Sequence, residues 1–198
     1  MTAPIRIVVT GGPGGGKTTA LDLFRREIGA RVAVVPESAT MLFQGGFPRS
    51  EQDDNVKRAG QASIFAVQRG LEQAQAALYP GRVLLCDRGT VDGAVYWPGS
   101  IDDYFAKMGA TLDDEMARYH AVLFFETAAA GGHDIKSGNP QRIESKANAV
   151  QLDRELLKLW SKHPRLHVIK NNTSFFQKVT EGVQALSALV DECERRPK

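Results

Sequence analysis

The sequence predicts an α/β protein in which helices cover both faces of a parallel sheet. The chain has 198 residues, of which 42% are hydrophobic and 24% charged, a composition typical of a soluble globular protein. Short apolar segments rich in β-branched residues alternate with amphipathic helical patterns. A glycine-rich loop joins the first of these segments to the first helical pattern. Alternation of this kind is typical of strands joined by helical crossovers, and it predicts a parallel sheet.

The elements follow in order along a single domain over residues 1–198. Gly29 is expected to end the first helix, Ser50 to begin the long one, and the turn at 171–173 to cap the last. The last helix carries an apolar stripe at positions 176, 179, 183, 186 and 190, which should pack on the sheet. The expected strands are 5–10, 31–36, 82–86, 120–126 and 165–170, and the main helices are 19–28, about 51–78, one or two within 101–119, about 144–162, and one after residue 173.

Residues 11–18, Gly-Gly-Pro-Gly-Gly-Gly-Lys-Thr, fit the pattern G-x-x-x-x-G-K-[ST] of the phosphate-binding P-loop. Glycines let backbone N–H groups approach a polyphosphate, and the helix N-terminus that follows favours anions. Lys17 is expected to reach the β- and γ-phosphates, and the Thr18 hydroxyl to bind Mg²⁺. No Asn-Lys-x-Asp guanine motif is present, which favours ATP while leaving the base preference open. The residues expected to bind the nucleotide are Gly12, Pro13, Gly14, Gly15, Gly16, Lys17, Thr18 and Thr19.

Charged residues follow the second and third expected strands. Because ligands of open α/β sheets bind at the carboxyl ends of the strands, Glu37 is a candidate general base; a capping or first-turn glutamate is the alternative. Asp87 ends a hydrophobic strand downstream of the P-loop, as in the Walker B pattern, and would hold the Mg²⁺ hydration shell opposite Thr18. Arg88 would direct a planar cation at a phosphate or the substrate, the alternative being an Asp87–Arg88 ion pair in a turn.

Three further residues are candidates for binding a second substrate. Gln68 lies on the long helix, where it either reads the edge of a nucleobase or belongs to a solvated face. Asp92 and Tyr96 are spaced i, i+4 in a short helical stretch at 90–96, so both can face one cleft. The aromatic residues Phe43, Phe47 and Trp97 are expected to be exposed and to line this pocket or a dimer surface.

Residues 127–146 are rich in glycine and polar residues and are expected to form a mobile lid. Arg142, together with Lys136 and Lys146, would then bring cations over the transferring phosphoryl group. The alternative is an ordinary surface loop with solvated basic residues.

The composition also excludes several classes of partner. A formal net charge of +2 does not predict nucleic-acid binding, and the apolar run at 121–125 is much too short to span a membrane. The N-terminus carries no signal-peptide pattern, so the expected location is the cytoplasm.

The two cysteines, Cys86 and Cys193, show neither a disulfide framework nor metal-ligand spacing, and are expected to be reduced. The partner expected is a small molecule, and the protein is expected to be a monomer or a homodimer.

Four motifs carry a resemblance over nearly the whole chain: G-G-P-G-G-G-K-T-T at 11–19, V-V-P-E-S-A at 34–39, L-L-C-D-R-G at 84–89, and a basic segment around Arg142. They resemble the nucleoside and nucleotide kinase branch of P-loop proteins. The P-E and D-R pairs are similar to deoxynucleoside kinases, a resemblance that implies an acceptor base at Glu37 and a positioning role for Arg88.

With Gln68, D-R-G-x-x-D, Tyr96 and R-x-E at 142–144, the chain is more similar still to small bacterial AAA-like ATP-binding proteins related to the ribosylnicotinamide kinase domain. The resemblance implies a three-layer P-loop NTPase fold with a five-stranded parallel sheet in the order 2-3-1-4-5, with ATP and Mg²⁺ as cofactors.

The function expected is therefore Mg²⁺-dependent phosphoryl transfer from ATP to a hydroxyl of a small, nucleoside-like acceptor. The catalytic residues would be Lys17, Glu37, Asp87, Arg88 and Arg142. Two alternatives remain open: a P-loop switch or regulatory ATPase that hydrolyses nucleotide without an acceptor, and a nucleoside monophosphate kinase.

Overall fold

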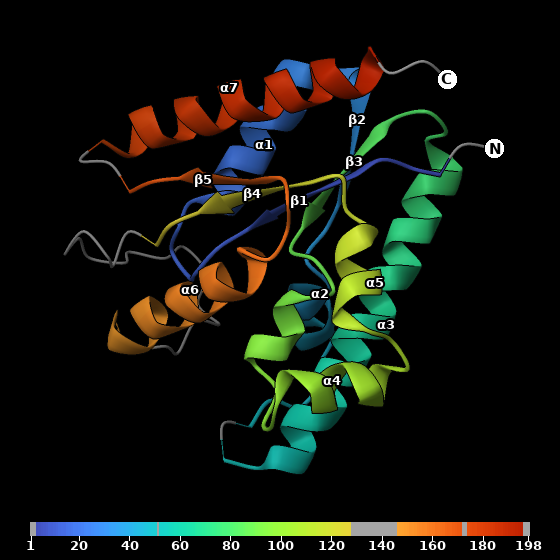
Figure 1. Ribbon diagram of the computed structural model, residues 1–198, viewed down its shortest axis with the longest axis vertical. Coiled ribbons are helices and arrows are strands. Elements are labelled where there is room, and N and C mark those ends of the chain that lie inside the picture. The colour runs from blue at the N-terminus through green and yellow to red at the C-terminus, as the bar shows by residue number, and fades with distance from the viewer. Residues whose placement is uncertain (1–2, 51, 128–145, 172–173, 196–198) are drawn as a thin grey trace.

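The computed structural model describes residues 3–50, 52–127, 146–171 and 174–195 (Figure 1). The expected lid, including Lys136 and Arg142, thus lies almost wholly outside the described residues. Within the described ranges, no helix combines the length and apolar character that crossing a membrane requires.

Five parallel strands form one sheet in the order β2-β3-β1-β4-β5, which confirms the predicted fold class and strand order. Four of the strands lie within the segments expected from the sequence, and β3 extends one residue beyond its segment, to Asp87. Short runs of β-branched and aromatic residues suit a sheet that is buried on both faces. The strand bounds are β1 Arg6–Thr10, β2 Val32–Val35, β3 Val83–Asp87, β4 Ala121–Phe125 and β5 Leu166–Ile169.

Helices cover both faces of this sheet, and alternate strand residues divide the core in two. Ile7 and Val9 of β1 face α1 and α7, whereas Val8 faces the cluster that includes α3 and α6. Figure 1 shows α1 and α7 together on one side and α3 to α6 on the other. The helices are α1 Lys17–Ile28, α2 Ser38–Gln44, α3 Asp54–Leu78, α4 Ile101–Met108, α5 Leu112–Ala117, α6 Lys146–Trp160 and α7 Phe175–Glu194, with short 3-10 turns η1 Gly29–Arg31 and η2 Asp92–Val95.

The start of α3 differs from the sequence prediction. Asp53, rather than Ser50, caps this helix, because its carboxylate accepts the backbone N–H groups of Asn55 and Val56. The Ser50 hydroxyl accepts N–H groups from residues 52 and 53, and so organises the turn that precedes the helix. In addition, the structure contains the short helix α2, which is not among the helices expected from the sequence.

The start of α7 also differs. Ser174 is the N-cap, accepting the Gln177 N–H, so the cap lies just beyond the predicted turn. Phe176 is 78% exposed and does not belong to the apolar stripe, which begins in fact at Val179. The remaining stripe packs on the sheet as predicted.

The parallel strands bring the candidate site together at one edge. The P-loop follows β1, Glu37 follows β2, and Asp87 is the last residue of β3, where it pairs in register with Val9 of β1. Since the carboxyl ends of neighbouring parallel strands meet at the same edge, these three segments converge although they are far apart in sequence.

Candidate functional site

The P-loop has the backbone that a phosphate cradle requires. Gly11, Gly14 and Gly16 have φ values of 134°, 73° and 87°, a region that residues with side chains rarely adopt. A Cβ at Gly11 would lie 2.0 Å from the carbonyl oxygen of Phe125 in β4, so the loop also packs too closely for a side chain there. The loop ends at Lys17, the first residue of α1, so its N–H groups lie at a helix N-terminus that favours anions.

Lys17 is buried at 4% exposure, and its ammonium donates to the carbonyl oxygens of Gly11 (2.9 Å) and Gly12 (2.8 Å). Its charge interacts with Glu37, Asp87 and Asp92. Thr18 and Thr19, the next residues of α1, are exposed. The loop thus holds a cation among carboxylates at its mouth, and a bound polyphosphate would add negative charge there.

Asp87 fits the role of a residue that holds Mg²⁺. It is 8% exposed, and burial, followed by the nearby Glu37 charge, raises its pKa to about 6 despite the opposing charges of Lys17 and Arg88. A divalent cation would favour the charged form of such a carboxylate. Among the described residues no group of three or more His, Cys, Asp or Glu side chains could hold a metal ion. Mg²⁺ commonly takes most of its ligands from phosphate and water, and Thr18 and Asp87 are the protein groups that would hold it.

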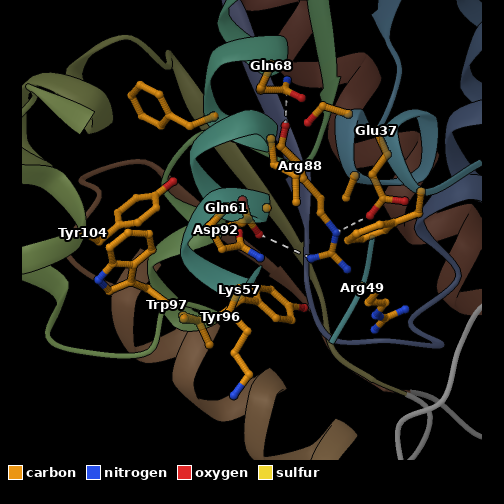
Figure 2. A pocket seen from close by; sticks show the side chains of 18 of the residues that line it. Glu37, Arg49, Lys57, Gln61, Gln68, Arg88, Asp92, Tyr96, Trp97 and Tyr104 are labelled. Atoms are coloured by element: carbon orange, nitrogen blue, oxygen red, sulfur yellow. Dashed lines mark hydrogen bonds and ion pairs between the residues drawn. The ribbon is translucent and has the colours of Figure 1, made fainter. Parts of the chain in front are cut away.

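Glu37 and Arg88 form the central ion pair of the site, with 2.6 Å between Glu37 Oε1 and Arg88 Nε (Figure 2). Burial raises the pKa of Glu37, but the Arg88 charge and the Thr40 hydroxyl lower it more, to about 2. Although Glu37 stands at the N-cap position of α2, its side chain makes no capping hydrogen bond. Arg88 pairs with Glu37 and approaches Asp92 (3.6 Å), so the predicted alternative of an Asp87–Arg88 pair is wrong.

Asp92 shapes the loop that carries Arg88. One carboxylate oxygen accepts the Thr10 hydroxyl, and the other accepts the Gly89 N–H at 2.8 Å. Among the described residues, Arg88 is the one non-glycine with a positive φ, at 69°, and such strain is found preferentially at functional sites. Tyr96 lies beneath the Arg88 guanidinium, with 5.9 Å from the guanidinium carbon to the ring centre.

Gln68 is 2% exposed, which excludes the solvated-face alternative. Its amide nitrogen donates to the Arg88 carbonyl oxygen (3.3 Å) and to Glu72 (3.2 Å), as Figure 2 shows for the first of these bonds. Gln68 therefore supports the strained backbone of Arg88 from α3. The structure brings it to the wall of the predicted cleft, together with Asp92 and Tyr96.

A cavity of about 490 Å³ lies between α2, α3 and the segment after β3, a size typical of small-molecule sites. Glu37, Arg88 and Asp92 line its inner part, and Figure 2 shows Trp97 and Tyr104 on the opposite side from Glu37. Trp97 is 5% exposed, so its predicted exposure is wrong, whereas its place in the pocket is confirmed. Phe47 instead packs against Gly60 of α3. The aromatic lining comprises Phe43, Phe65, Tyr96, Trp97 and Tyr104.

The sequence interpretation missed Asp153 of α6. Its Oδ1 accepts the N–H groups of Gly12 (2.7 Å) and Thr127 (3.0 Å). A signal was present, because Asp153 interrupts the buried face of α6 formed by Ala149, Leu156 and Trp160. A carboxylate on a buried helical face needs partners, since an uncompensated one is costly.

Comparisons with known proteins agree with this geometry. A family model described as an AAA domain matches residues 6–178. No curated protein matched in a sequence comparison. The crystal structure of the NadR protein in complex with NR is similar at a TM-score of 0.69 and 15% identity, over 94% of this chain and 51% of that one.

The NadR protein in complex with NAD and AMP-PNP is similar at a TM-score of 0.65 and 14% identity, over 96% of this chain and 50% of that one. The chain thus spans about half the length of these solved structures. At such identities the likeness shows the fold alone, and 320 solved chains match, so the fold does not single out a substrate. The family match covers most of the chain, including the glycine loop, the five strands of the parallel sheet and the charged residues at the sheet edge. The chain therefore belongs to the AAA domain family of P-loop proteins.

Proposed function

We propose that the protein transfers the terminal phosphoryl group of ATP, with Mg²⁺, to a hydroxyl of a small, nucleoside-like acceptor bound in the 490 Å³ cavity. The reaction needs alignment of the two reactants and neutralisation of charge more than covalent help from the protein. A P-loop beside an acceptor-sized cavity supplies the two binding places that such a transfer needs.

The observation that carries this proposal is the Glu37–Arg88 pair. Both side chains line the cavity, while Arg88 also reaches within 3.5 Å of the carbonyl oxygen of Gly11 in the P-loop. The pair therefore spans the boundary between the two binding places. An enzyme that only hydrolysed nucleotide would not require a carboxylate and a guanidinium aimed into a second, aromatic cavity.

Each residue has a role that follows from its surroundings. Lys17 and Arg88 would neutralise charge on the phosphates, and Mg²⁺, held near Thr18 and Asp87, would add further positive charge when bound. Glu37, with a pKa of about 2, is charged at neutral pH. It can therefore accept a hydrogen bond from the acceptor hydroxyl and so orient it, but it is too weak a base to keep the hydroxyl proton. Because the transition state of phosphoryl transfer is loose, orienting that hydroxyl is the main requirement.

The structural relatives support the choice of ligands. One NadR structure is a complex with NR and the other a complex with NAD and AMP-PNP, the latter an analogue of ATP. These ligands belong to those proteins, and they support a nucleotide donor and a nucleoside-like acceptor as the first to test here.

Among the described residues, the cations that line the cavity are Arg49, Lys57 and Arg88, so a nucleoside monophosphate stays an alternative acceptor in the test. Two further arginines, Arg58 and Arg69, lie outside this lining. Arg58 donates to Asp103 and to the carbonyl oxygen of Pro98, and Arg69 donates to Glu115. These guanidiniums already have partners, so binding a phosphate-bearing acceptor would require them to exchange one partner for another.

The test is ADP release from ATP and Mg²⁺, measured alone and with a panel of nucleosides, ribosylnicotinamide, nucleoside monophosphates and sugars. We expect a nucleoside-like acceptor to raise ADP release by at least about 100-fold, because alignment of the acceptor makes the largest contribution. Lys17→Ala should abolish turnover. Glu37→Gln should bind ATP normally and lose transfer. Glu155→Gln, on the exposed face of α6, is the control and should keep both ATP binding and transfer.

Slow ADP release that no acceptor accelerates would contradict the proposal. It would favour the nucleotide-hydrolysing switch, and the search would turn to a protein partner. Normal transfer by Glu37→Gln would refute only the role given to Glu37.

A further inference from the structure

We propose that Asp153 is a positioning residue of the nucleotide site, which sets the first half of the P-loop from α6 before any phosphate binds. The inference rests on the proposed nucleotide binding at the P-loop, and it adds a residue that no motif in the sequence identifies. Figure 1 shows α6 on the side of the sheet opposite α1 and α7, near the turn that joins β1 to α1.

The first contact is with Gly12. The Gly12 N–H donates to Asp153 Oδ1 at 2.7 Å. A Cβ at Gly12 would lie 2.5 Å from this same oxygen and 2.7 Å from the Asp153 Cβ. The carboxylate therefore occupies the space that a side chain at Gly12 would need, and the glycine and the aspartate fit as a pair.

The second contact is through Thr127, just after β4. Its N–H donates to the same Asp153 oxygen at 3.0 Å, and its hydroxyl donates to the carbonyl oxygen of Pro13 at 2.6 Å. The Gly12–Pro13 segment is thus held at both ends, by Asp153 at the Gly12 N–H and by Thr127 at the Pro13 carbonyl. Lys17 holds the Gly12 carbonyl between them at 2.8 Å.

The surroundings hold the Asp153 carboxyl group firmly, although burial keeps its pKa above the ordinary value. Asp153 is 5% exposed. Burial raises the pKa of Asp153, and the N–H groups of Gly12 and Thr127 and the Lys17 charge oppose this. Lys178 of α7 also interacts with Asp153, and its ammonium donates to the carbonyl oxygen of Glu126, next to Thr127. Side chains from α6 and α7 and the segment after β4 therefore meet next to the Gly12–Pro13 segment of the P-loop.

The functional consequence is preorganisation. A loop whose N–H groups already point toward the phosphate positions loses less conformational freedom when nucleotide binds, and so binds it more tightly. Asp153 touches neither nucleotide nor acceptor in this proposal, and acts only through the backbone of Gly12 and Thr127.

The test compares Asp153→Ala with Asp153→Asn, measuring the Kd for ATP·Mg²⁺ and the hydrogen–deuterium exchange of the peptide that covers residues 11–18. Loss of two charge-assisted hydrogen bonds should raise the Kd by about tenfold or more and speed exchange in that peptide. Asparagine keeps an oxygen that accepts both N–H groups, so Asp153→Asn should remain within about threefold of the wild-type Kd. Glu155→Ala on the same helix is the matched control and should change neither measurement.

Thr127→Val provides a second route in case Asp153→Ala fails to fold. This variant keeps the hydrogen bond from the backbone N–H of residue 127 to Asp153 and removes the hydroxyl bond to the Pro13 carbonyl oxygen, so it should raise the Kd by several-fold. Thr127→Ser keeps the hydroxyl and should have the wild-type Kd. The inference would be overturned if Asp153→Ala kept the wild-type Kd and the wild-type exchange rate. Where Asp153→Ala does not fold, the same result in Thr127→Val would overturn it. An equal rise of the Kd in Asp153→Ala and Asp153→Asn would overturn it too. Absence of ATP binding by the wild-type protein would instead refute the proposed function, and the exchange measurement would still test the role of Asp153.

Discussion

The Glu37–Arg88 pair predicts that Glu37→Gln destabilises the protein in a pH-dependent way. The pKa of Glu37 falls from an ordinary value of 4.5 to about 2 in the folded protein. A carboxyl group whose pKa is lowered by folding contributes stability above its unfolded pKa and loses that contribution as pH falls toward the folded pKa. The contribution of Glu37 should therefore be complete at neutral pH and disappear between about pH 4.5 and pH 2.

The size follows from the shift, since each unit corresponds to about 1.4 kcal/mol. A shift of 2.5 units corresponds to about 3 kcal/mol at pH 7, and linkage reduces this to about 1 kcal/mol at pH 3. Asp87 acts in the opposite direction, because burial and then the Glu37 charge raise its pKa to about 6. Removing Glu37 relieves part of that penalty, so about 3 kcal/mol is an upper value.

The assay is urea unfolding of wild-type protein and Glu37→Gln at pH 7 and pH 3. The difference in unfolding free energy between the two proteins should shrink by about 2 kcal/mol at the lower pH. Glu155→Gln is the same chemical change on an exposed surface. Its difference in unfolding free energy from the wild type should be nearly the same at pH 7 and pH 3. A Glu37→Gln difference that does not depend on pH would refute the reasoning, because it would mean that the Arg88 pair does not hold Glu37 charged.

Two further changes test the backbone of the site and the buried network behind it. Gly11→Ala should destabilise the fold by at least about 3 kcal/mol, because a Cβ would meet the Phe125 carbonyl oxygen at 2.0 Å; thermal unfolding measures this, and an unchanged Tm would contradict it. Glu72→Gln should cost about 3 kcal/mol, because Glu72 is fully buried and pairs with Arg6 (3.1 Å) and Arg118, which would lose a counter-charge; urea unfolding measures this, and a loss under about 0.5 kcal/mol would argue against the network.

Local patterns were enough to predict most of the fold. The strands are short apolar runs and the helices have apolar stripes at helical spacing, so both types could be recognised from neighbouring residues alone. Errors arose at helix starts, where more than one polar residue can act as the cap. Ser50 and Asp53 can both cap a helix, and in the structure it is the Asp53 carboxylate that accepts the N–H groups of Asn55 and Val56. Phe176 was misplaced for a different reason: its spacing puts it on the same helical face as Val179, but it lies in the first turn of α7 and is exposed there.

The candidate site was predictable only in part. Strand ends placed Glu37, Asp87 and Arg88 at the same edge, because parallel strands align their carboxyl ends. Their pairing was not predictable, since Asp87 adjoins Arg88 in the chain while Glu37 is the residue that contacts it. The role of Gln68 depends on which side of α3 faces Arg88, and the burial of Trp97 depends on how the segment after β3 folds onto α3 and α4.

The α/β class, the P-loop motif and the sheet edge where the charged residues gather could all be predicted from the amino-acid sequence alone. Glycine spacing, helical period and strand-end position are local properties, which a short stretch of chain carries whatever its surroundings. Three contacts, by contrast, follow from the packing of distant elements: Glu37 with Arg88, Gln68 with the Arg88 backbone, and Asp153 with Gly12 across 141 positions of sequence. Those contacts depend on how separate elements pack, because a hydrogen bond requires two atoms within about 3 Å and no local pattern specifies which distant side chain arrives there.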